Sequence, residues 1–526
     1  MKAPLFHPAT CRPAAKTDLS FSAHARRLYN MKMLRRLLTL FALALSLASA
    51  QPVDRAKIDA AVQKAMHDWG VPGAAIAIVR GDEVLLTQGY GVKELGKPDP
   101  VTANTVFAIG SMTKAFTTAA MAMLVDEGKM NWDDPVRKHI EFFHLYDPLA
   151  DAMVTLRDLV CHRTGLSRND ILWYNSPLTS EQIIRRIAHI KPTHQFRTMW
   201  QYNNLMFLTA GFAAGKAAGM PWSDFVQKRI FDPLGMTSTD VTVQAAQSAP
   251  DHSSPHRKRG DKTDVVSWYS LDNIAPAGAI NSNAQDMAKW ARFQLSDGTF
   301  AGKRLISARN MTEMHTSQMV IRPEEWGRSY NPETHEITYG MAWSIQDYRG
   351  LHMVSHGGAI NGFRSTISLL PDQKIGIVVL SNLDQENMPE ALRYSLIDIM
   401  LGLPPRDWDA VLIEHFHDEE KQARAAAKKR ADARVPNTKP SHELAAYAGE
   451  YFEPAYGAAS VTASDGQLMI AWNNFRGPLE HFNFDTFQVK EGQMQGTPVQ
   501  FHLAANGAVR SMTFLGVDFE RKSEHR

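Results

Sequence analysis

The sequence predicts an α+β domain followed by a smaller antiparallel β domain. Strand-like apolar runs stand on both sides of a long, mainly helical stretch that extends from Ser111 to about Trp290. These runs are residues 73–79, 83–90, 341–346, 363–370 and 375–380. Strands at both ends with helices between them indicate one sheet that is closed by segments far apart in the sequence.

Turn and spacing signals support the individual elements of this first domain. Apolar residues between Ile58 and Trp69 recur at helical spacing, which predicts an amphipathic helix before the first strand. Gly81 and Asp82 separate the first two strand-like runs and are typical of a hairpin turn. The segment 371–374, Pro-Asp-Gln-Lys, joins the last two runs in the same way.

The first fifty residues contain the pattern of a secretory signal peptide. A basic stretch at 31–36 precedes the apolar run 37–47, and Ala48-Ser49-Ala50 forms a small-residue cleavage site before Gln51. The apolar run is shorter than the roughly 20 residues that a membrane span needs. We therefore expect a periplasmic or secreted protein without a stable membrane span after cleavage. A retained N-terminal anchor is the alternative, and translation starts at either Met1 or Met31.

The composition changes again after Pro404 and Pro405. Residues 414–434 are dense in Glu, Lys, Arg and Ala, which predicts an exposed helical linker. From Leu444 to Arg521, short apolar runs alternate with turns, a pattern that indicates a small antiparallel barrel or sandwich. The predicted parts are a leader and signal peptide (1–50), a first domain (51–405), a charged helical linker (406–440) and a β domain (441–526).

Length, charge and cysteine content limit the classes of partner and cofactor. The chain has 526 residues, and its 57 basic and 55 acidic residues give a formal net charge of +2. That charge is too small for the field that attracts nucleic acid, so we expect no nucleic-acid partner. Signal cleavage leaves Cys161 as the one cysteine, which excludes an internal disulfide. Cys161 and His162 alone fall short of a zinc site, so we predict a buried thiol and neither metal nor cofactor.

Ser111 and Lys114 form a Ser-x-x-Lys pattern at the predicted start of a helix. Residues i and i+3 lie on one helix face, so the Lys114 amine can reach the Ser111 hydroxyl. Serine needs a neighbouring base to become a nucleophile, and lysine can be that base only if its surroundings keep it partly neutral. About two such patterns are expected by chance in a chain of this length. The alternative is a serine that caps the helix, followed by a solvated lysine.

Tyr202-Asn203-Asn204 precedes a second apolar helical run. A nearby ammonium favours the phenolate form, so a tyrosine beside a lysine can exchange protons with the serine and the leaving group. Asn204 would hold the lysine or orient a substrate amide. A buried tyrosine with its hydroxyl satisfied is the alternative.

His356-Gly357-Gly358-Ala359 ends the strand-like stretch 351–355. Two glycines at a strand edge allow a substrate backbone to approach and free the next N–H groups to face an oxyanion. The alternative is a glycine-rich turn with a surface histidine.

Together, these three stretches resemble the serine β-lactamase and penicillin-binding-protein superfamily. The Tyr-x-Asn and His-Gly-Gly patterns are similar to its class C-like branch of DD-peptidases, D-aminopeptidases and family VIII-type esterases. The likeness covers roughly residues 58–400, and residues 444–521 look like the lipocalin-like domain that some of these peptidases carry. The resemblance implies an antiparallel sheet with a helical subdomain, followed by a small C-terminal β-barrel.

The resemblance also implies a role for each site residue. Ser111 would be the nucleophile that forms an acyl-enzyme, Lys114 its activating partner, and Tyr202 the general base and acid. Asn204 would orient the lysine or the substrate. His356 takes the place of the lysine in the family's Lys-Thr-Gly motif. Gly357, Gly358 and Ala359 would line the substrate and oxyanion site, with the backbone N–H groups of Ser111 and Ala359 forming the oxyanion hole.

The histidine at position 356 is a departure from the family pattern. The resemblance links the motif's lysine to the carboxylate of penicillin-like substrates, and a neutral histidine provides less charge there. Arg163-Thr164-Gly165 follows a helical pattern and precedes Tyr202, so we interpret it as a structural turn and not as the missing motif. This departure argues against efficient β-lactam hydrolysis but not against acyl transfer.

Four functions are consistent with these patterns. The preferred one is an exported serine hydrolase that cleaves amide bonds in small-molecule or peptide substrates. A carboxylesterase with the same residues is the second, a true β-lactamase the third, and a non-catalytic binding protein the fourth. A homo-oligomer is possible in each case.

Overall fold

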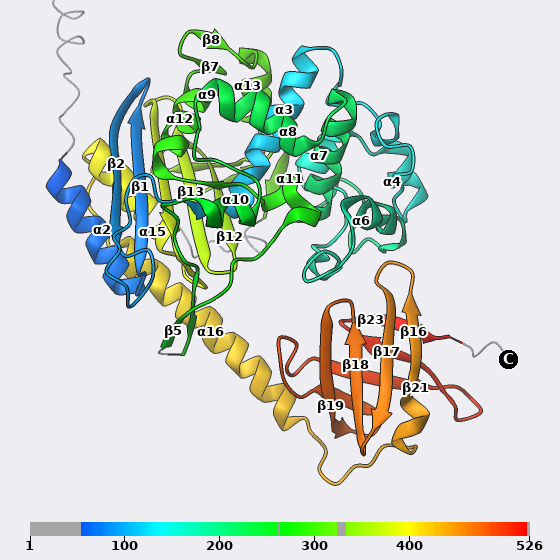
Figure 1. Ribbon diagram of the computed structural model, residues 1–526. Helices are drawn as coiled ribbons and strands as arrows, with labels where there is room; N and C mark the ends of the chain where they lie inside the picture. The colour runs from blue at the N-terminus through cyan, green and yellow to red at the C-terminus, as the bar shows by residue number, and fades with distance from the viewer. Residues whose placement is uncertain (1–53, 261, 323–332, 523–526) are drawn as a thin grey trace, which may run out of the picture. The chain divides into compact units, whose positions relative to one another are not determined.

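The computed structural model describes residues 54–260, 262–322 and 333–522 of the chain (Figure 1). The predicted leader and signal peptide, residues 1–50, lies outside these ranges. Within them, no helix combines the length and apolar character needed to cross a membrane.

The α+β prediction is confirmed by a mixed sheet-and-helix domain built around one antiparallel sheet of eight strands. Neighbours in this sheet come from both ends of the domain, because Ala74 of β1 pairs with Ser381 of β14. The strands, in spatial order, are β2 (Glu83–Gly91), β1 (Gly73–Arg80), β14 (Ile375–Ser381), β13 (Phe363–Leu370), β12 (Leu351–Ile360), β11 (Ser344–Tyr348), β10 (Ile337–Tyr339) and β9 (Met319–Ile321).

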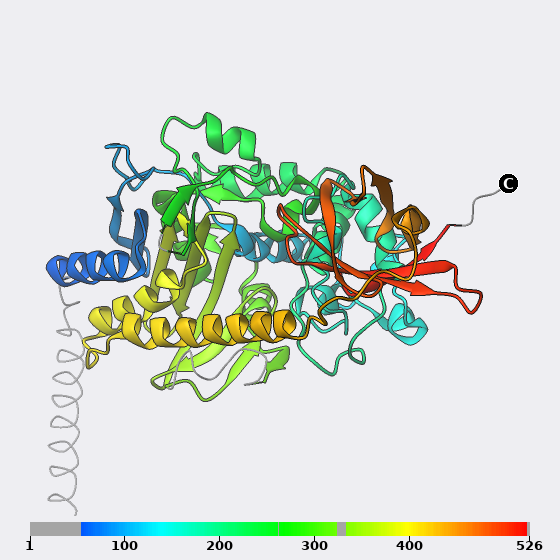
Figure 2. The same cartoon turned by 90° about the horizontal axis from the view of Figure 1, so that it is seen from below.

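Helices cover both faces of this sheet (Figures 1 and 2). On one side, α2 packs against α15, and α15 packs against β14; on the other, α12 packs against β1 and β14. Strand β1 is buried along nearly its whole length, as expected of a strand between two helical layers. These helices are α2 (Arg55–Trp69), α12 (Ala284–Leu295) and α15 (Met388–Leu401).

A helical subdomain joins the two halves of the sheet. Its central helices are α3 and α7, which pack against each other, and α7 also contacts α5 and α11. The helices of this region are α3 (Thr113–Asp126), α4 (Pro148–Met153), α5 (Leu156–Val160), α6 (Ser180–Arg186), α7 (Asn204–Ala218), α8 (Trp222–Val226), α9 (Asp232–Leu234), α10 (Val243–Ser248), α11 (Ala275–Gly278) and α13 (Ala308–Met314).

Three small sheets complete the domain. The pair that matters for the site is β3 (Phe107–Ala108) with β6 (Asn281–Ser282), because Ser111 follows β3 directly. The others are β15 (Leu383–Asp384) with β4 (His256–Arg259) and β5 (Lys262–Val265), and β7 (Thr299–Phe300) with β8 (Lys303–Arg304).

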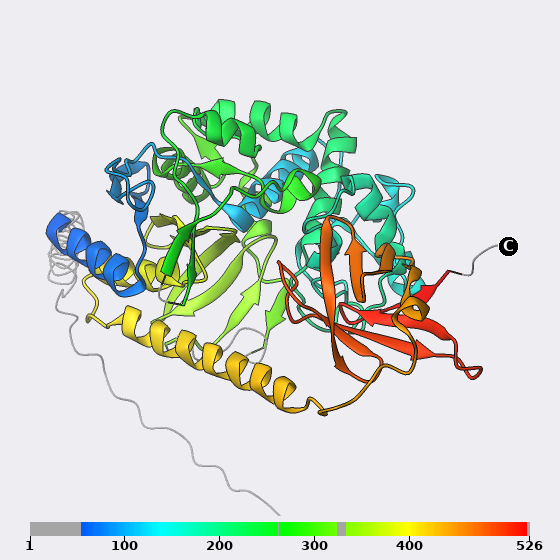
Figure 3. The same cartoon turned by 60° about the horizontal axis from the view of Figure 1, so that its bottom comes forward.

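The C-terminal part folds as a closed barrel of eight strands (Figure 3), as expected. It closes where Tyr451 of the first strand pairs with Arg521 of the last. Aromatic side chains fill the interior, among them Trp472, Phe501 and Phe519. The strands are β16 (Gly449–Glu453), β17 (Gly457–Ser464), β18 (Gln467–Trp472), β19 (Phe475–Asn483), β20 (Thr486–Val489), β21 (Pro498–Leu503), β22 (Val509–Phe514) and β23 (Val517–Arg521). The long helix α16 (Trp408–Asp432), which precedes the barrel in sequence, is buried only at its start.

One predicted strand begins later than expected. The apolar run 341–346 was expected to be extended throughout, but β11 starts at Ser344, and Ala342 has a φ of +68°. The Met341 amide donates to Met314 O (2.9 Å), and residues 341–343 are fully buried. Their apolar character therefore reflects packing in the core and not strand pairing.

Candidate active site

Ser111 lies in a 3₁₀ turn, Gly110–Met112, directly before α3. It does not cap that helix, because the N-cap position is Met112 and no side chain makes a capping hydrogen bond there. The Ile109 amide donates to Ile280 O (3.0 Å), which ties the turn to the strand pair β3–β6. The alternative of a helix-capping serine is therefore wrong.

Gly110 and Gly358 allow the Ser111 turn to pass close to strand β12. A Cβ on Gly358 would lie 2.0 Å from Ile109 O and 2.3 Å from Ser365 Oγ. Gly110 has a φ of +52°, and its Cβ would lie 2.8 Å from the Ala359 nitrogen. This close approach brings the turn that carries Ser111 next to Ala359; the oxyanion hole itself stays a prediction.

The glycines of His356-Gly-Gly do not make room for a substrate as we expected. Gly358 makes room for the chain's own Ile109 carbonyl, and a Cβ on Gly357 would meet Glu390 Oε1 at 3.1 Å. The expectation is wrong because the sequence could not show which backbone approaches the strand.

Gly358→Ala is expected to lower the free energy of unfolding by about 1–3 kcal/mol, the usual cost of overpacking. It is also expected to lower activity per folded molecule by about 100-fold, because the Ser111 turn must shift. Gly357→Ala is the matched control, since its new methyl group meets the flexible end of Glu390 at 3.1 Å and lies in ordinary contact with Ser365 O at 3.7 Å. Denaturant unfolding and active-site titration measure both effects, and equal losses in the two variants would contradict the steric argument.

Lys114 is fully buried in α3, with its amine against the serine. Nζ lies 2.9 Å from Ser111 Oγ and donates to Ala277 O at 2.7 Å. Burial lowers the pKa of Lys114 well below its ordinary value of 10.5, and the charge of Arg168 lowers it further, while Asp170 opposes the shift. A neutral Lys114 amine has a lone pair that can accept the Ser111 proton.

Tyr202 completes this group from the segment before α7. Its hydroxyl is hydrogen-bonded to Ser111, and its ring centre lies 4.8 Å from Lys114 Nζ. Burial raises the pKa of Tyr202 to about 12, outweighing the lowering effects of Arg168 and of the Ser111 hydrogen bond. The expected lysine-stabilised phenolate is therefore wrong: burial disfavours the charged form of both groups, and Tyr202 is a neutral phenol.

Asn203 and Asn204 begin helix α7 and have different partners. Asn203 caps the helix through Oδ1, which accepts from the Met206 amide (3.2 Å). Asn204 is buried, and its Nδ2 donates to Asp170 Oδ1 (2.8 Å). Since a carboxylate only accepts, the Asn204 amide must face Asp170 with its nitrogen. The Asn204 Oδ1 atom is then left buried without a partner in the described part of the chain.

Asp170 and Arg168 are site residues that the sequence analysis missed. Asp170 Oδ1 also accepts from Trp173 Nε1 (2.7 Å), and Oδ2 pairs with the Arg168 guanidinium. The Arg168 Cζ lies 5.0 Å from the Tyr202 ring centre. No motif marks these residues, because they lie more than thirty positions before Asn204 and meet it only in the fold.

His356 is buried and forms part of the site wall, so the alternative of a surface histidine is wrong. Its Nε2 lies 3.1 Å from the Tyr339 hydroxyl, and its Nδ1 lies 2.6 Å from Gly357 O. Burial lowers the pKa of His356 to about 3. His356 is therefore neutral and cannot replace the charge of the Lys-Thr-Gly lysine.

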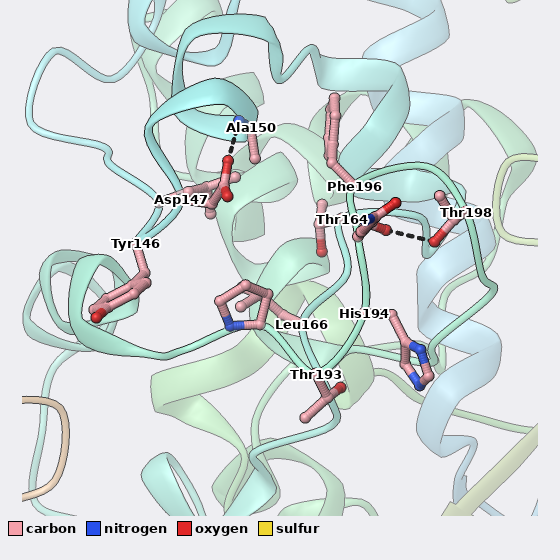
Figure 4. Close-up of a pocket in the computed structure, with 12 residues that line it drawn as sticks. Tyr146, Asp147, Ala150, Thr164, Leu166, Thr193, His194, Phe196 and Thr198 are labelled. Atoms are coloured by element: carbon pink, nitrogen blue, oxygen red, sulfur yellow. Dashed lines mark hydrogen bonds between the residues drawn. The ribbon is translucent and has the colours of Figure 1, made fainter.

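A pocket of about 520 Å³ lies elsewhere in the helical subdomain (Figure 4). It is bounded by Tyr146 and Asp147 on one loop and by Thr193, His194 and Phe196 on another. Neither Ser111, Lys114 nor Tyr202 lines it. Cys161 is a buried free thiol, and the described ranges contain no cluster of three His, Cys, Asp or Glu residues that could hold a metal.

Comparisons with known proteins identify the family of the chain. Residues 58–400 match the family model named Beta-lactamase, and residues 433–525 match a domain of unknown function, DUF3471. The chain is 29% identical over 458 residues to the unguisins hydrolase ungD' of Aspergillus campestris, covering 82% of this chain and 80% of that protein.

Two solved structures share the fold. The octameric penicillin-binding protein homologue from Pyrococcus abyssi is 20% identical, with a TM-score of 0.59, and covers 89% of this chain and 99% of its own. The D-stereospecific amidohydrolase from Streptomyces is 24% identical, with a TM-score of 0.53, and covers 66% of this chain and 98% of its own. Because the family model matches well over half of the chain, the protein belongs to the β-lactamase family of serine hydrolases.

Proposed function

We propose that the protein is an exported hydrolase that cleaves amide bonds in peptides through an acyl-enzyme on Ser111. Three features support the chemistry: a serine hydroxyl 2.9 Å from a buried amine, a neutral tyrosine on the same hydroxyl, and the close approach of the turn that carries Ser111 to the Ala359 nitrogen. The observation that favours amides as substrates is the unpartnered Oδ1 of Asn204.

Acylation starts with the neutral Lys114 amine. Its lone pair takes the proton of Ser111 while Oγ attacks the substrate carbonyl carbon, and the carbonyl electrons move onto oxygen. The backbone N–H groups of Ser111 and Ala359 donate to that oxyanion. This assignment differs from the expectation that Tyr202 is the base, because a phenol with a pKa of about 12 keeps its proton at neutral pH.

Tyr202 then serves as the proton donor to the leaving group. When the tetrahedral intermediate collapses, the C–N bond breaks and the leaving nitrogen takes the Tyr202 proton. The Lys114 ammonium, which lies beside the Tyr202 ring, then returns to the phenolate the proton that it took from Ser111, because Ser111 Oγ is now acylated and has no proton to pass on. Water repeats the sequence on the acyl-enzyme: it gives a proton to the lysine, attacks the ester carbon and restores the Ser111 hydroxyl. The amine and the acid are the two products.

Asn204 distinguishes an amide from an ester. Asp170 holds Asn204 Nδ2, so the unpartnered atom of this side chain is an acceptor, Oδ1, and not a donor. Because Oδ1 is buried in the structure, the proposal requires that a bound substrate reaches it. A substrate N–H can donate to this buried oxygen, whereas the oxygen of a scissile ester cannot. A buried acceptor without a partner is costly, which gives the amide substrate an advantage.

A matched pair of substrates tests this proposal. An aminoacyl p-nitroanilide and the p-nitrophenyl ester of the same acyl group, in D and L forms, are compared in wild type and in Asn204→Leu. We expect Asn204→Leu to lower kcat/KM for the anilide about tenfold more than for the ester, since only the anilide loses a hydrogen bond. Equal losses, with the ester the better substrate, would indicate an esterase.

A chromogenic cephalosporin is expected to turn over slowly, because His356 is neutral.

Export and assembly are parts of the same proposal. The basic, apolar and small-residue regions at 31–50 support removal of a signal peptide before Gln51 and a periplasmic or secreted location. N-terminal sequencing of the exported protein is expected to begin at Gln51, and Met31→Ala is expected to prevent expression if Met31 is the start. Unchanged export of that variant would contradict the Met31 start.

The octameric relative from Pyrococcus abyssi supports a homo-oligomer, and light scattering measures the oligomeric state.

A further inference from the structure

His162 lies directly behind Tyr202, and the mechanism above does not use it. Its side chain is fully buried, and its ring centre lies 4.4 Å from that of Tyr202, 4.9 Å from that of Tyr339 and 5.0 Å from that of Phe207. Its backbone has a φ of +57°, in the left-handed region that few residues other than glycine adopt. Such conformations persist where the surrounding structure holds them and often occur at functional sites.

His162 accepts two hydrogen bonds from the backbone amides on either side of Tyr202. The Gln201 amide donates to the His162 carbonyl oxygen (2.8 Å), and the Asn203 amide donates to the His162 Nδ1 (3.0 Å). One residue therefore holds the backbone on both sides of Tyr202 and packs against the ring between them. Backbone bonds on both sides leave the Tyr202 Cα little freedom to move.

The bond to Asn203 also determines the tautomer of His162. Because a backbone N–H donates to Nδ1, that nitrogen has no proton, and the proton is on Nε2. Burial lowers the pKa of His162 well below 6.5, and the charge of Arg168 acts in the same direction. Both effects favour the neutral ring, in which Nδ1 is the acceptor for the Asn203 amide.

The segment that carries His162 is itself held by a buried carboxylate. Asp158 accepts from Arg163 Nε (2.6 Å) and Arg197 Nη2 (2.7 Å), and it caps α5 together with Thr155. The Arg197 amide also donates to the Arg163 carbonyl (2.8 Å). This network connects α5 to the chain that leads into Tyr202, so His162 is fixed from both directions.

We propose that His162 is a positioning residue that aims the Tyr202 hydroxyl at Ser111 through its Nδ1 acceptor and its ring. The inference rests on the Ser111 chemistry proposed above, but it does not depend on which acyl group Ser111 accepts. Its test therefore uses a probe of the nucleophile and not a substrate.

The experiment compares His162→Asn with His162→Gly in the full chain. Both replacements tolerate a positive φ, but only asparagine provides an acceptor close to the position of Nδ1. A tagged fluorophosphonate reports the second-order rate at which Ser111 is labelled, and thermal unfolding reports stability. We expect His162→Asn to be labelled close to the wild-type rate, and His162→Gly about 10–100-fold more slowly per folded molecule. Cys161→Ala, next to His162, controls for local packing and is expected to react like wild type.

Each outcome separates this inference from the proposed function. If wild type is not labelled, the Ser111 chemistry is wrong. If wild type is labelled and the asparagine and glycine variants react equally, whether fast or slowly, the positioning role is overturned.

A measurement on wild type keeps the test valid if a variant fails to fold. Nitrogen-15 spectra are expected to show a coupling across the hydrogen bond between the Asn203 amide nitrogen and His162 Nδ1. They are also expected to show a neutral Nε2–H ring that does not titrate between pH 8 and pH 5. A proton on Nδ1, or a ring that titrates normally, would overturn the inference.

Discussion

Lys114→Met is expected to abolish turnover and to raise the free energy of unfolding at the same time. Activity should fall by about 10⁴-fold or more, because the variant has no amine to accept the Ser111 proton. Stability should rise because methionine removes an ionisable group from a fully buried position in α3. A functional residue that destabilises its own fold is a known compromise at active sites.

The difference in the free energy of unfolding between Lys114→Met and wild type is expected to depend on pH. The pKa of Lys114 is lowered in the folded protein relative to 10.5, so between these two pKa values the unfolded chain binds a proton that the folded chain does not. The wild-type free energy of unfolding therefore rises as the pH increases toward 10.5, and the advantage of Lys114→Met shrinks. Wild-type kcat/KM is expected to fall at low pH as the amine becomes protonated.

Denaturant unfolding at pH 7 and pH 10, with kcat/KM measured across the same range, checks both effects. Lys303→Met, at an exposed position in β8, is the control for the substitution itself. If Lys114→Met is less stable than wild type at pH 7, or keeps substantial activity, Lys114 is not the neutral base.

Ser111→Ala is expected to remove fluorophosphonate labelling completely and to lower turnover by about 10⁴-fold or more. The fold should be unchanged, because the hydroxyl bonds only to Lys114 and Tyr202 among the contacts described above. Mass spectrometry of the labelled wild-type protein should place the adduct on the peptide that contains Ser111.

Ser365→Ala is the matched control for this variant. Its hydroxyl is also close to the site and donates to Ile109 O (2.9 Å), but it is not placed to attack a substrate. We expect it to keep its labelling. An adduct that persists in Ser111→Ala would show that another residue is the nucleophile.

Local sequence was enough to predict most of the fold. The hairpin at Gly81-Asp82 and the antiparallel pair on either side of the turn at Pro371 form as expected. Both signals are local, because turn residues and apolar runs specify structure within a few positions of the chain. The alternating pattern after Leu444 correctly predicted a small antiparallel β domain but left a barrel and a sandwich open, and the structure forms the closed barrel that the family resemblance implied. The prediction that the run from Met341 is extended from its first residue was wrong, because a buried turn and a buried strand are equally apolar.

The core of the site was also visible in the sequence, since Ser111 and Lys114 lie three residues apart on adjoining helical turns. Tyr202 and His356 were found from their motifs and not from local geometry. Asp170, Tyr339 and His162 were missed, because each meets its partner across a long stretch of chain and leaves no short-range signal.

The amino-acid sequence therefore determines which side chains are available to the site. The tertiary structure determines which protonation state each of them favours and which neighbours it contacts. The surroundings of Lys114 and Tyr202 lower the pKa of the amine and raise that of the phenol, and both shifts favour the neutral forms; those surroundings depend on segments far away in the sequence. Gly358 makes room for the chain's own Ile109 carbonyl, and Asn204 offers an oxygen because Asp170 holds its nitrogen. A pairwise motif contains no information about solvation or about a third neighbour, and those two quantities determine how this site acts.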